Sequence, residues 1–287
     1  MASINRFKES YLKANDMQNE DFRHAQRAKQ KGFSFSQMVF VIVMIFMFLP
    51  LLVLILYSFN STKGMHWTSF SFVWYEKLFF NSRSLWQSFG NSIFIALSAS
   101  LIATILGTAG AIGISWHRFK TRSYTQIVSY LPMVLPEIVM AIALLIFFSS
   151  VSIKLGLLTI IIAHVTFTVP FTWLMVQARL DEFDFTIIEA AHDLGADELH
   201  TLLRITLPLS LPGIVSGFLT AITISLENFV ITFFVSGPGA STLTLSVYAA
   251  MKYGVSPVIN AISVVMIIGT VILAYLFRNF LKYFVAK

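Results

Sequence analysis

The sequence predicts an all-α protein, a polytopic bundle of six transmembrane helices. Hydrophobic residues make up 56% of the 287 positions and charged residues only 12%, against the roughly 25% charged residues that are usual in soluble domains. The apolar residues gather into six runs, each long enough to cross about 30 Å of hydrocarbon. The chain has no Cys, which excludes disulfides, thiolate metal sites and cysteine nucleophiles.

Each apolar run contains around 20 residues, as a membrane-spanning helix requires. The first run follows a polar segment, residues 1–37, and it is too long for a cleaved signal peptide. We therefore expect an N-terminal tail at 1–37, a transmembrane domain at 38–281 and a C-terminal tail at 282–287. The six predicted spans are 38–59, 92–114, 127–148, 157–176, 213–235 and 258–277.

Lys and Arg are distributed unevenly between the two sides of the predicted bundle. The N-terminal tail, the loops at 116–126 and 179–212 and the C-terminus carry fifteen of the 20 basic residues, and the other loops carry five. Cytoplasmic loops are enriched in Lys and Arg, so both termini are predicted to lie in the cytoplasm. The same rule accounts for the net charge of +6 without a nucleic-acid partner.

Two groups of residues inside the spans predict how the helices pack. Small residues recur every four positions in the second span, a spacing that lets helices approach closely: Ala99, Ala103, Gly107 and Ala111. Prolines inside the spans each remove a backbone donor and are expected to kink or break the helix: Pro50, Pro132, Pro136 and Pro170.

The loop between the fourth and fifth spans has the composition of a structured element. It carries seven acidic and two basic residues. Asp184 can cap a first short helix, Gly195 supplies a left-handed stop, and Asp197 can cap a second helix that ends before Pro208. The apolar residues of this loop exceed what a solvated connector exposes, so we expect neighbours or a partner to cover part of it.

The same loop resembles the signature loop of permease subunits in bacterial ABC importers. Glu189-Ala190-Ala191 is followed, after three residues, by Gly195, and after nine more by Ile205 and then Leu207-Pro208. In that family, the loop forms helices that dock on the ATP-hydrolysing subunit and transmit its movement. The resemblance implies a type I ABC importer permease fold and assigns ATPase coupling to Glu189, Ala190, Ala191, Asp193, Gly195, Ile205, Leu207 and Pro208.

Two other interpretations of this loop remain open. Its acidic residues could simply cap and solubilise a cytoplasmic hairpin, or its carboxylates could bind a hard cation. The sequence has no HExxH pattern and no His pair at i, i+4 in this loop. The potential ligands are Glu189, His192, Asp193, Asp197, Glu198 and His200. We assign no metal site and no catalytic residue to the chain. The glycine-containing segment 237–242 lacks the Lys of a phosphate-binding loop, so ATP and Mg²⁺ are expected on a partner subunit.

Only two of the fourteen acidic residues, Glu137 and Glu227, fall within predicted spans. Burying an ionisable group in a membrane costs at least about 2 to 3 kcal/mol, which makes it a functional candidate. No Lys or Arg lies at a comparable depth, so a cation, a proton or another subunit must stabilise these charges. With His164, Trp173 and Asn228 they form a predicted pathway suited to ammonium groups. A packing role for His164, a place for Trp173 in the aromatic belt at the membrane interface, and a backbone-bonding role for Glu137 beside Pro136 remain alternatives.

The wider sequence, over roughly residues 38–280, resembles the spermidine/putrescine branch of these permeases, and in particular their second permease subunit. The motifs that carry this resemblance include Tyr57-Ser58-Phe59-Asn60, Pro136-Glu137-Ile138, His164-Val165-Thr166-Phe167 and Ser236-Gly237-Pro238. Such permeases often have two adjacent acids in the fifth span, where this chain has Glu227-Asn228. This departure leaves the identity of the polyamine open.

The resemblance implies a multi-pass subunit of an ATP-driven importer in the bacterial inner membrane that moves polyamines by alternating access. The implied partners, besides membrane lipid, are a homologous permease subunit, two ATPase subunits, an external solute-binding protein and the polyamine itself. Two alternatives remain open. One is the same machine for another solute, such as iron, thiamine or an organic anion. The other is an intramembrane enzyme that uses Glu137, His164 and Glu227 as metal ligands or acid–base groups.

Overall fold

The computed structural model describes residues 35–285 except 65, 118, 185 and 253–256. Within these residues the chain is helical, and the β-type contacts are limited to one isolated bridge between Asn60 and Phe70. The chain separates into two compact units, Met1–Tyr57 and Ser58–Lys287. Five described helices are long and apolar enough to cross a membrane, or six if one sharply bent helix pair counts as a single span.

The first unit contributes helix α2 (Phe35–Ser58), which ends at the boundary between the units. Most of its side chains are exposed, and apolar residues occur on every side of the helix. A helix that is hydrophobic all round is typical of a membrane span, so the first predicted span is confirmed. Pro50 lies inside this continuous helix. Most of the N-terminal tail expected at residues 1–37 lies outside the described residues.

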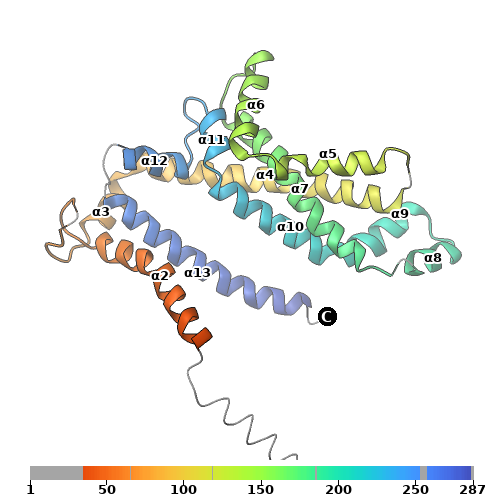
Figure 1. Cartoon of the computed structure of the whole chain (residues 1–287), viewed down its shortest axis with the longest axis horizontal. Coiled ribbons are helices and arrows are strands. Elements are labelled where there is room, and N and C mark those ends of the chain that lie inside the picture. The colour runs from red at the N-terminus through yellow and green to blue at the C-terminus, as the bar shows by residue number, and fades with distance from the viewer. Residues whose placement is uncertain (1–34, 65, 118, 185, 253–256, 286–287) are drawn as a thin grey trace, which may run out of the picture. The chain divides into compact units, whose positions relative to one another are not determined.

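Three long helices, α4 (Arg83–Trp116), α7 (Leu157–Asp181) and α10 (Leu207–Glu227), lie side by side at the centre of the second unit (Figure 1). They approach closely around Thr172 of α7, whose hydroxyl donates a hydrogen bond to the carbonyl of Ala103 in α4 (2.8 Å). A side chain added at Gly107 would collide with Thr172, and one added at Gly217 of α10 would lie 3.2 Å from the Thr172 Cα. The close approach predicted from the small residues is confirmed.

The third predicted span consists of two helices, α5 (Arg122–Val134) and α6 (Glu137–Ser150), which are bent by 105° relative to each other. Pro136 has no N–H, and its ring forces Leu135 into an extended conformation (φ −71°, ψ 142°). The break expected at Pro136 is therefore confirmed. Pro132 and Pro170, in contrast, lie inside helices that continue past them.

The fifth predicted span, 213–235, is also interrupted, and here the prediction of one continuous helix was wrong. Helix α10 ends at Glu227, Asn228 and Phe229 are not helical, and α11 (Val230–Val235) follows. The Asn228 side-chain oxygen accepts a hydrogen bond from the backbone N–H of Ile231 (3.1 Å). An Asn side chain that bonds the backbone in this way competes with helix continuation and starts a new helix.

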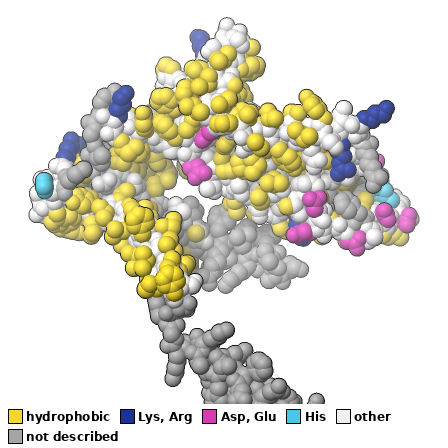
Figure 2. Space-filling model, viewed as in Figure 1, with side chains coloured by type: hydrophobic (Ala, Val, Ile, Leu, Met, Phe, Trp, Pro, Cys, Tyr) yellow, Lys and Arg dark blue, Asp and Glu magenta, His cyan; other side chains and the backbone are white. Residues whose placement is uncertain are grey.

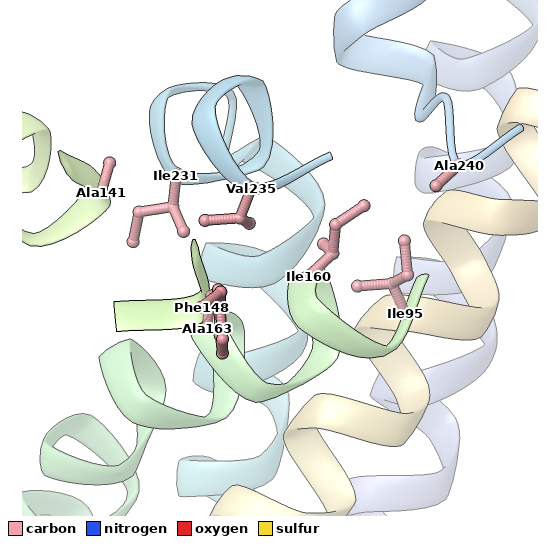
Figure 3. Close-up of a cluster of buried hydrophobic side chains, with 8 residues drawn as sticks. All are labelled: Ile95, Ala141, Phe148, Ile160, Ala163, Ile231, Val235 and Ala240. Atoms are coloured by element: carbon pink, nitrogen blue, oxygen red, sulfur yellow. The ribbon is translucent and has the colours of Figure 1, made fainter. Parts of the chain in front are cut away.

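A buried hydrophobic cluster holds the short helices α6 and α11 against the long helices α4 and α7 (Figure 3). Each of its members has an exposed fraction of 1% or less: Ile95, Ala141, Phe148, Ile160, Ala163, Ile231, Val235 and Ala240. Protein interiors pack as densely as organic crystals, so such a cluster resists deformation. It therefore fixes the beginning of α6 relative to the break between α10 and α11.

Helices α3 (Val73–Asn81) and α12 (Leu243–Lys252) and the first turns of α13 (Pro257–Val285) lie at the end of the unit away from the loop between α7 and α10 (Figure 1). Helix α3 buries Trp74 and Leu78 against α13. Helix α12 is tied to α4, because the Ser92 hydroxyl accepts a hydrogen bond from the Leu243 N–H (2.8 Å). Helix α13 continues to Val285, so the tail expected at 282–287 is helical up to that residue.

Candidate coupling surface and intramembrane site

The predicted coupling loop forms two short helices, α8 (Thr186–Asp193) and α9 (Glu198–Thr201). Asp184 precedes α8, and its carboxylate accepts a hydrogen bond from the Thr186 N–H (3.0 Å). Hydrogen bonds from the side chain and the backbone of Thr186 lower the pKa of Asp184 because they favour the charged carboxylate. Asp197 caps α9, accepting a hydrogen bond from the His200 N–H (2.7 Å). Both predicted caps are confirmed.

Gly195 ends α8 in the left-handed conformation that the sequence predicts, with φ +86°. The Ala196 N–H donates to the carbonyl of Ala191 (3.0 Å), and the Gly195 N–H donates to the carbonyl of His192 (2.9 Å). These two hydrogen bonds form a Schellman motif, which closes the C-terminal end of a helix. The corner between α8 and α9 is therefore a defined turn.

The surface of this loop is open, and apolar side chains are exposed on it beside the acidic ones. The side chains of Leu194, Leu199 and Leu203 are 90%, 62% and 54% exposed. Figure 2 shows acidic side chains gathered at the end of the molecule that carries α8 and α9. Among the signature residues, Ala191 is buried, Ile205 and Leu207 are half-buried, and the others are exposed: Glu189, Ala190, Asp193, Gly195 and Pro208. Exposed apolar patches of this kind are typical of interaction surfaces.

The second loop helix does not end before Pro208, and this part of the prediction was wrong. Helix α9 continues into α10 through a π-helical turn, η1 (Leu202–Thr206). In an α-helix, the ring of Pro208 would clash with the carbonyl of Arg204. The wider turn, in which the Leu207 N–H donates to the carbonyl of Leu202, relieves this clash. Residues Glu198–Glu227 therefore form one connected helical segment.

The two membrane carboxylates lie where the interrupted helices begin and end. Glu137 is the first residue of α6 and is half-buried, whereas Glu227 is the last residue of α10 and is exposed. The Glu137 carboxylate interacts with the side-chain amide of Asn228, the backbone N–H of Ile231 and the charge of Glu227. Within the described part of the chain, no ion pair involves either carboxylate. The site thus brings two acidic groups together without a fixed basic partner.

Residues 103–287 match the model of the family described as "Binding-protein-dependent transport system inner membrane component". The chain belongs to this family. The match includes the coupling loop, both interrupted spans and the two carboxylates.

Curated relatives of this permease are named as transport subunits. The spermidine/putrescine transport system permease protein PotC of Haemophilus influenzae is 41% identical over 220 residues, which cover 76% of this chain and 85% of the relative. PotC of Escherichia coli K12 is 36% identical over 217 residues (75% and 82%). The putrescine permease PotI of the same strain is 38% identical over 224 residues (75% and 79%). These names identify a transport subunit and decide against the enzyme interpretation.

Solved structures of ABC transporters share the fold of this permease. One is a bacterial alginate ABC transporter in complex with an alginate pentasaccharide-bound periplasmic protein. Its matched chain has a TM-score of 0.68 and 16% identity, with 95% of this chain and 98% of that chain covered. The MetNI methionine transporter gives a TM-score of 0.59 at 18% identity, with 73% and 98% covered. The predicted all-α permease fold of an ABC importer is confirmed.

Three of the five predicted pathway residues lie together in this permease: Glu137, Glu227 and Asn228. His164 is buried between the helices next to this site. The His164 side chain is 1% exposed. Its Nδ1 is hydrogen-bonded to the hydroxyl of Ser225 in α10 (2.7 Å), and its Nε2 to that of Thr232 in α11 (2.9 Å). His164 therefore joins α7 to both sides of the break, and it is not exposed along a pathway.

Trp173, the fifth predicted pathway residue, does not lie at this site. It follows His164 by nine residues on α7 and is 6% exposed. Its indole ring covers Gly110 of α4, where an added side chain would collide with it, and it contacts the ring of Tyr130 at 6.3 Å between centroids. The indole fills the space left by a glycine inside the bundle, so Trp173 has a packing role that was not predicted from the sequence.

Two features of the structure were not predicted from the sequence: the π-helical turn and a group of aromatic side chains next to the break in the fifth span. The rings of Phe229 and Tyr248 lie 4.8 Å apart between centroids, and those of Phe233 and Tyr248 lie 6.0 Å apart. The i, i+4 spacing of the two phenylalanines was a local signal, but their contact with α12 is long-range.

The part of the chain that the structure describes also contains no group of three or more acidic or His residues that could hold a metal ion.

Proposed function

We propose that this permease is one of two homologous membrane subunits of an ATP-driven importer of polyamines, with putrescine and spermidine as candidate substrates. Curated relatives at 36% to 41% identity carry those substrates in their names, which supports the proposal. The structural observation that carries it is the placement of two carboxylates at the breaks of the interrupted spans: Glu137 begins α6, Glu227 ends α10, and α6 packs on the α11 helix that follows Glu227.

The chemistry of this site favours a substrate with more than one positive charge. Two carboxylates in a membrane repel each other, and attraction to a cation strengthens as the local dielectric falls. The N-terminal end of α6 stabilises the charge of Glu137, and the C-terminal end of α10 adds partial negative charge beside Glu227. In transporters, unwound backbone and helix C-terminal ends contribute cation ligands in this way. A diamine can neutralise both carboxylates at once, whereas a monovalent cation cannot.

The corner between α8 and α9 is the proposed docking surface for the ATPase. Leu194 and Leu199 offer apolar contact area there, and the turn at Gly195 keeps the two helices at a defined angle. Residues Glu198–Glu227 form one connected helical segment. A displacement of α9 would therefore pass along α10 to Glu227, as rigid elements do in alternating-access transport.

The complete importer would contain this chain, a second permease, two ATPase subunits that hold ATP and Mg²⁺, and an external solute-binding protein. Both termini of this chain would lie in the cytoplasm, on the side of the coupling loop. The match to a transporter structure that includes a periplasmic protein supports this composition. This chain itself would bind neither nucleotide nor metal.

The test is uptake of labelled putrescine and spermidine by cells that express all subunits of the importer. We expect saturable uptake of at least one polyamine, and its loss when the ATPase subunit is inactivated. Uptake of labelled thiamine, a labelled iron chelate and a labelled organic anion is measured in parallel to test the alternative substrates. Uptake of one of these compounds, with no uptake of either polyamine, would contradict the proposal.

A further inference from the structure

Three aromatic side chains gather directly beyond the acidic site. Phe229 is one of the two non-helical residues after Glu227, Phe233 lies one turn later in α11, and Tyr248 comes from α12. The ring centroids of Phe229 and Tyr248 are 4.8 Å apart, those of Phe229 and Phe233 are 5.6 Å apart, and those of Phe233 and Tyr248 are 6.0 Å apart. Each ring therefore contacts the other two.

These rings occupy the open face of α11. Ile231 and Val235 are fully buried in the hydrophobic cluster with α6 and α7. Phe229 and Phe233 are offset from them by two residues, or about 200° around the helix, which places them on the opposite face. The side chain of Phe233 is 48% exposed and that of Tyr248 is 41% exposed. Ring surface is thus accessible next to the carboxylates.

The electrostatic surroundings of this aromatic group suit a cation. Glu227 and Asn228 directly precede Phe229 in the chain, and Glu137 interacts with both of those residues. Within α10, α11 and α12 the sole basic residue is Lys252, the last residue of α12, one turn after Tyr248. Since α10 runs from the coupling loop to Glu227 and α11 continues the chain, the aromatic group lies on the far side of Glu227 from that loop.

We infer that Phe229, Phe233 and Tyr248 form a cation–π subsite for one ammonium group of the substrate. This inference rests on the proposed polyamine function. The face of an aromatic ring carries negative charge density and attracts an alkylammonium group. One ammonium group contacts the rings, a second contacts the carboxylates, and the methylene groups between them lie against the apolar ring edges. The aromatic group then selects for polyamines over small inorganic cations, which lack such a chain.

The experiment replaces Phe229, in the complete importer, with mono-, di- and trifluorophenylalanine. Fluorine withdraws charge from the ring face and leaves the size and apolar character of the side chain nearly unchanged. We expect the KM for putrescine and spermidine to rise with each fluorine and to reach about two- to tenfold with three. Tyr248→Leu should raise KM by a similar factor, and Tyr248→Phe should restore it. Phe147 of α6, which is 53% exposed and pairs with Phe148, provides the fluorinated control.

The outcomes separate this inference from the proposed function. If the unaltered importer takes up a polyamine and its KM is unchanged across the fluorine series, the cation–π subsite is wrong and the polyamine function stands. If Tyr248→Leu lowers the amount of assembled importer while fluorination has no effect, the rings only pack against a neighbour, and the inference is equally wrong. Absence of polyamine uptake by the unaltered importer would overturn both.

Discussion

Substitution of Gly195 tests the coupling surface most directly. Gly195 has φ +86°, and no atom lies within 4 Å of an added Cβ, so an Ala side chain has room and only the backbone conformation is penalised. A left-handed conformation costs an L-residue about 1–2 kcal/mol, which lowers the equilibrium constant for forming the native corner by about five- to thirtyfold. Asn tolerates this region better than Ala. Pro fixes φ near −65° and also removes the N–H that bonds the carbonyl of His192.

The assay is polyamine uptake at matched amounts of chain in the membrane, with ATP hydrolysis by the partner subunit recorded alongside. We expect uptake to fall in the order Gly195→Asn, Gly195→Ala, Gly195→Pro, because the docking surface changes while the helix bundle does not. Gly239→Ala is the matched control. Gly239 also has a positive φ, +77°, and no atom within 4 Å of an added Cβ, but it lies in the loop after α11.

Two results would refute this reasoning. Normal uptake by a well-inserted Gly195→Pro variant would show that the corner between α8 and α9 does not transmit the movement of the ATPase. An equal loss of uptake in Gly239→Ala would show that transport responds to strain in any loop. The proposed role of Gly195 in coupling would then be wrong.

Further predictions concern the carboxylates, the helix packing and the topology. A charge-assisted contact is worth about 1.5–3 kcal/mol, so Glu227→Gln should reduce uptake by about ten- to hundredfold. Glu137→Gln should reduce uptake by a smaller factor, since that carboxylate also interacts with neutral protein groups. Unchanged uptake in the double variant would contradict the predicted role of both carboxylates. Gly107→Ala should destabilise the purified permease by about 1–3 kcal/mol, because the added Cβ collides with Thr172. Gly113→Ala, with no atom within 4 Å of its Cβ, is the control, and equal melting temperatures would count against the packing argument. Reporter fusions at four positions test the topology. We expect reporters fused after Phe80 and Gly239 to lie outside the cell and those fused after Lys120 and Ala196 to lie in the cytoplasm. A reporter on the opposite side at any of these positions would contradict the six-span prediction.

The features that could be predicted from the sequence are those that depend on neighbours in the chain. A run of around 20 apolar residues in a bilayer must satisfy its own backbone hydrogen bonds, and the helix does so locally. The caps at Asp184 and Asp197 and the stop at Gly195 involve partners within five residues, as their hydrogen bonds show. The break at Pro136 is equally local, because the proline ring acts on the residue before it.

The placement of the candidate site was decided only by the tertiary structure. The sequence of the fifth span is apolar enough for one continuous helix, but the helix is interrupted at Asn228. The Asn228 side chain accepts a hydrogen bond from the Ile231 N–H, and α11 packs on α6 and α7. His164 and Trp173 are polar or aromatic residues of one predicted span. Contacts with other helices place the first between two hydroxyl groups near the break and the second over a glycine of α4. Such contacts join residues tens of positions apart, and only packing decides which of the sterically possible partners meet.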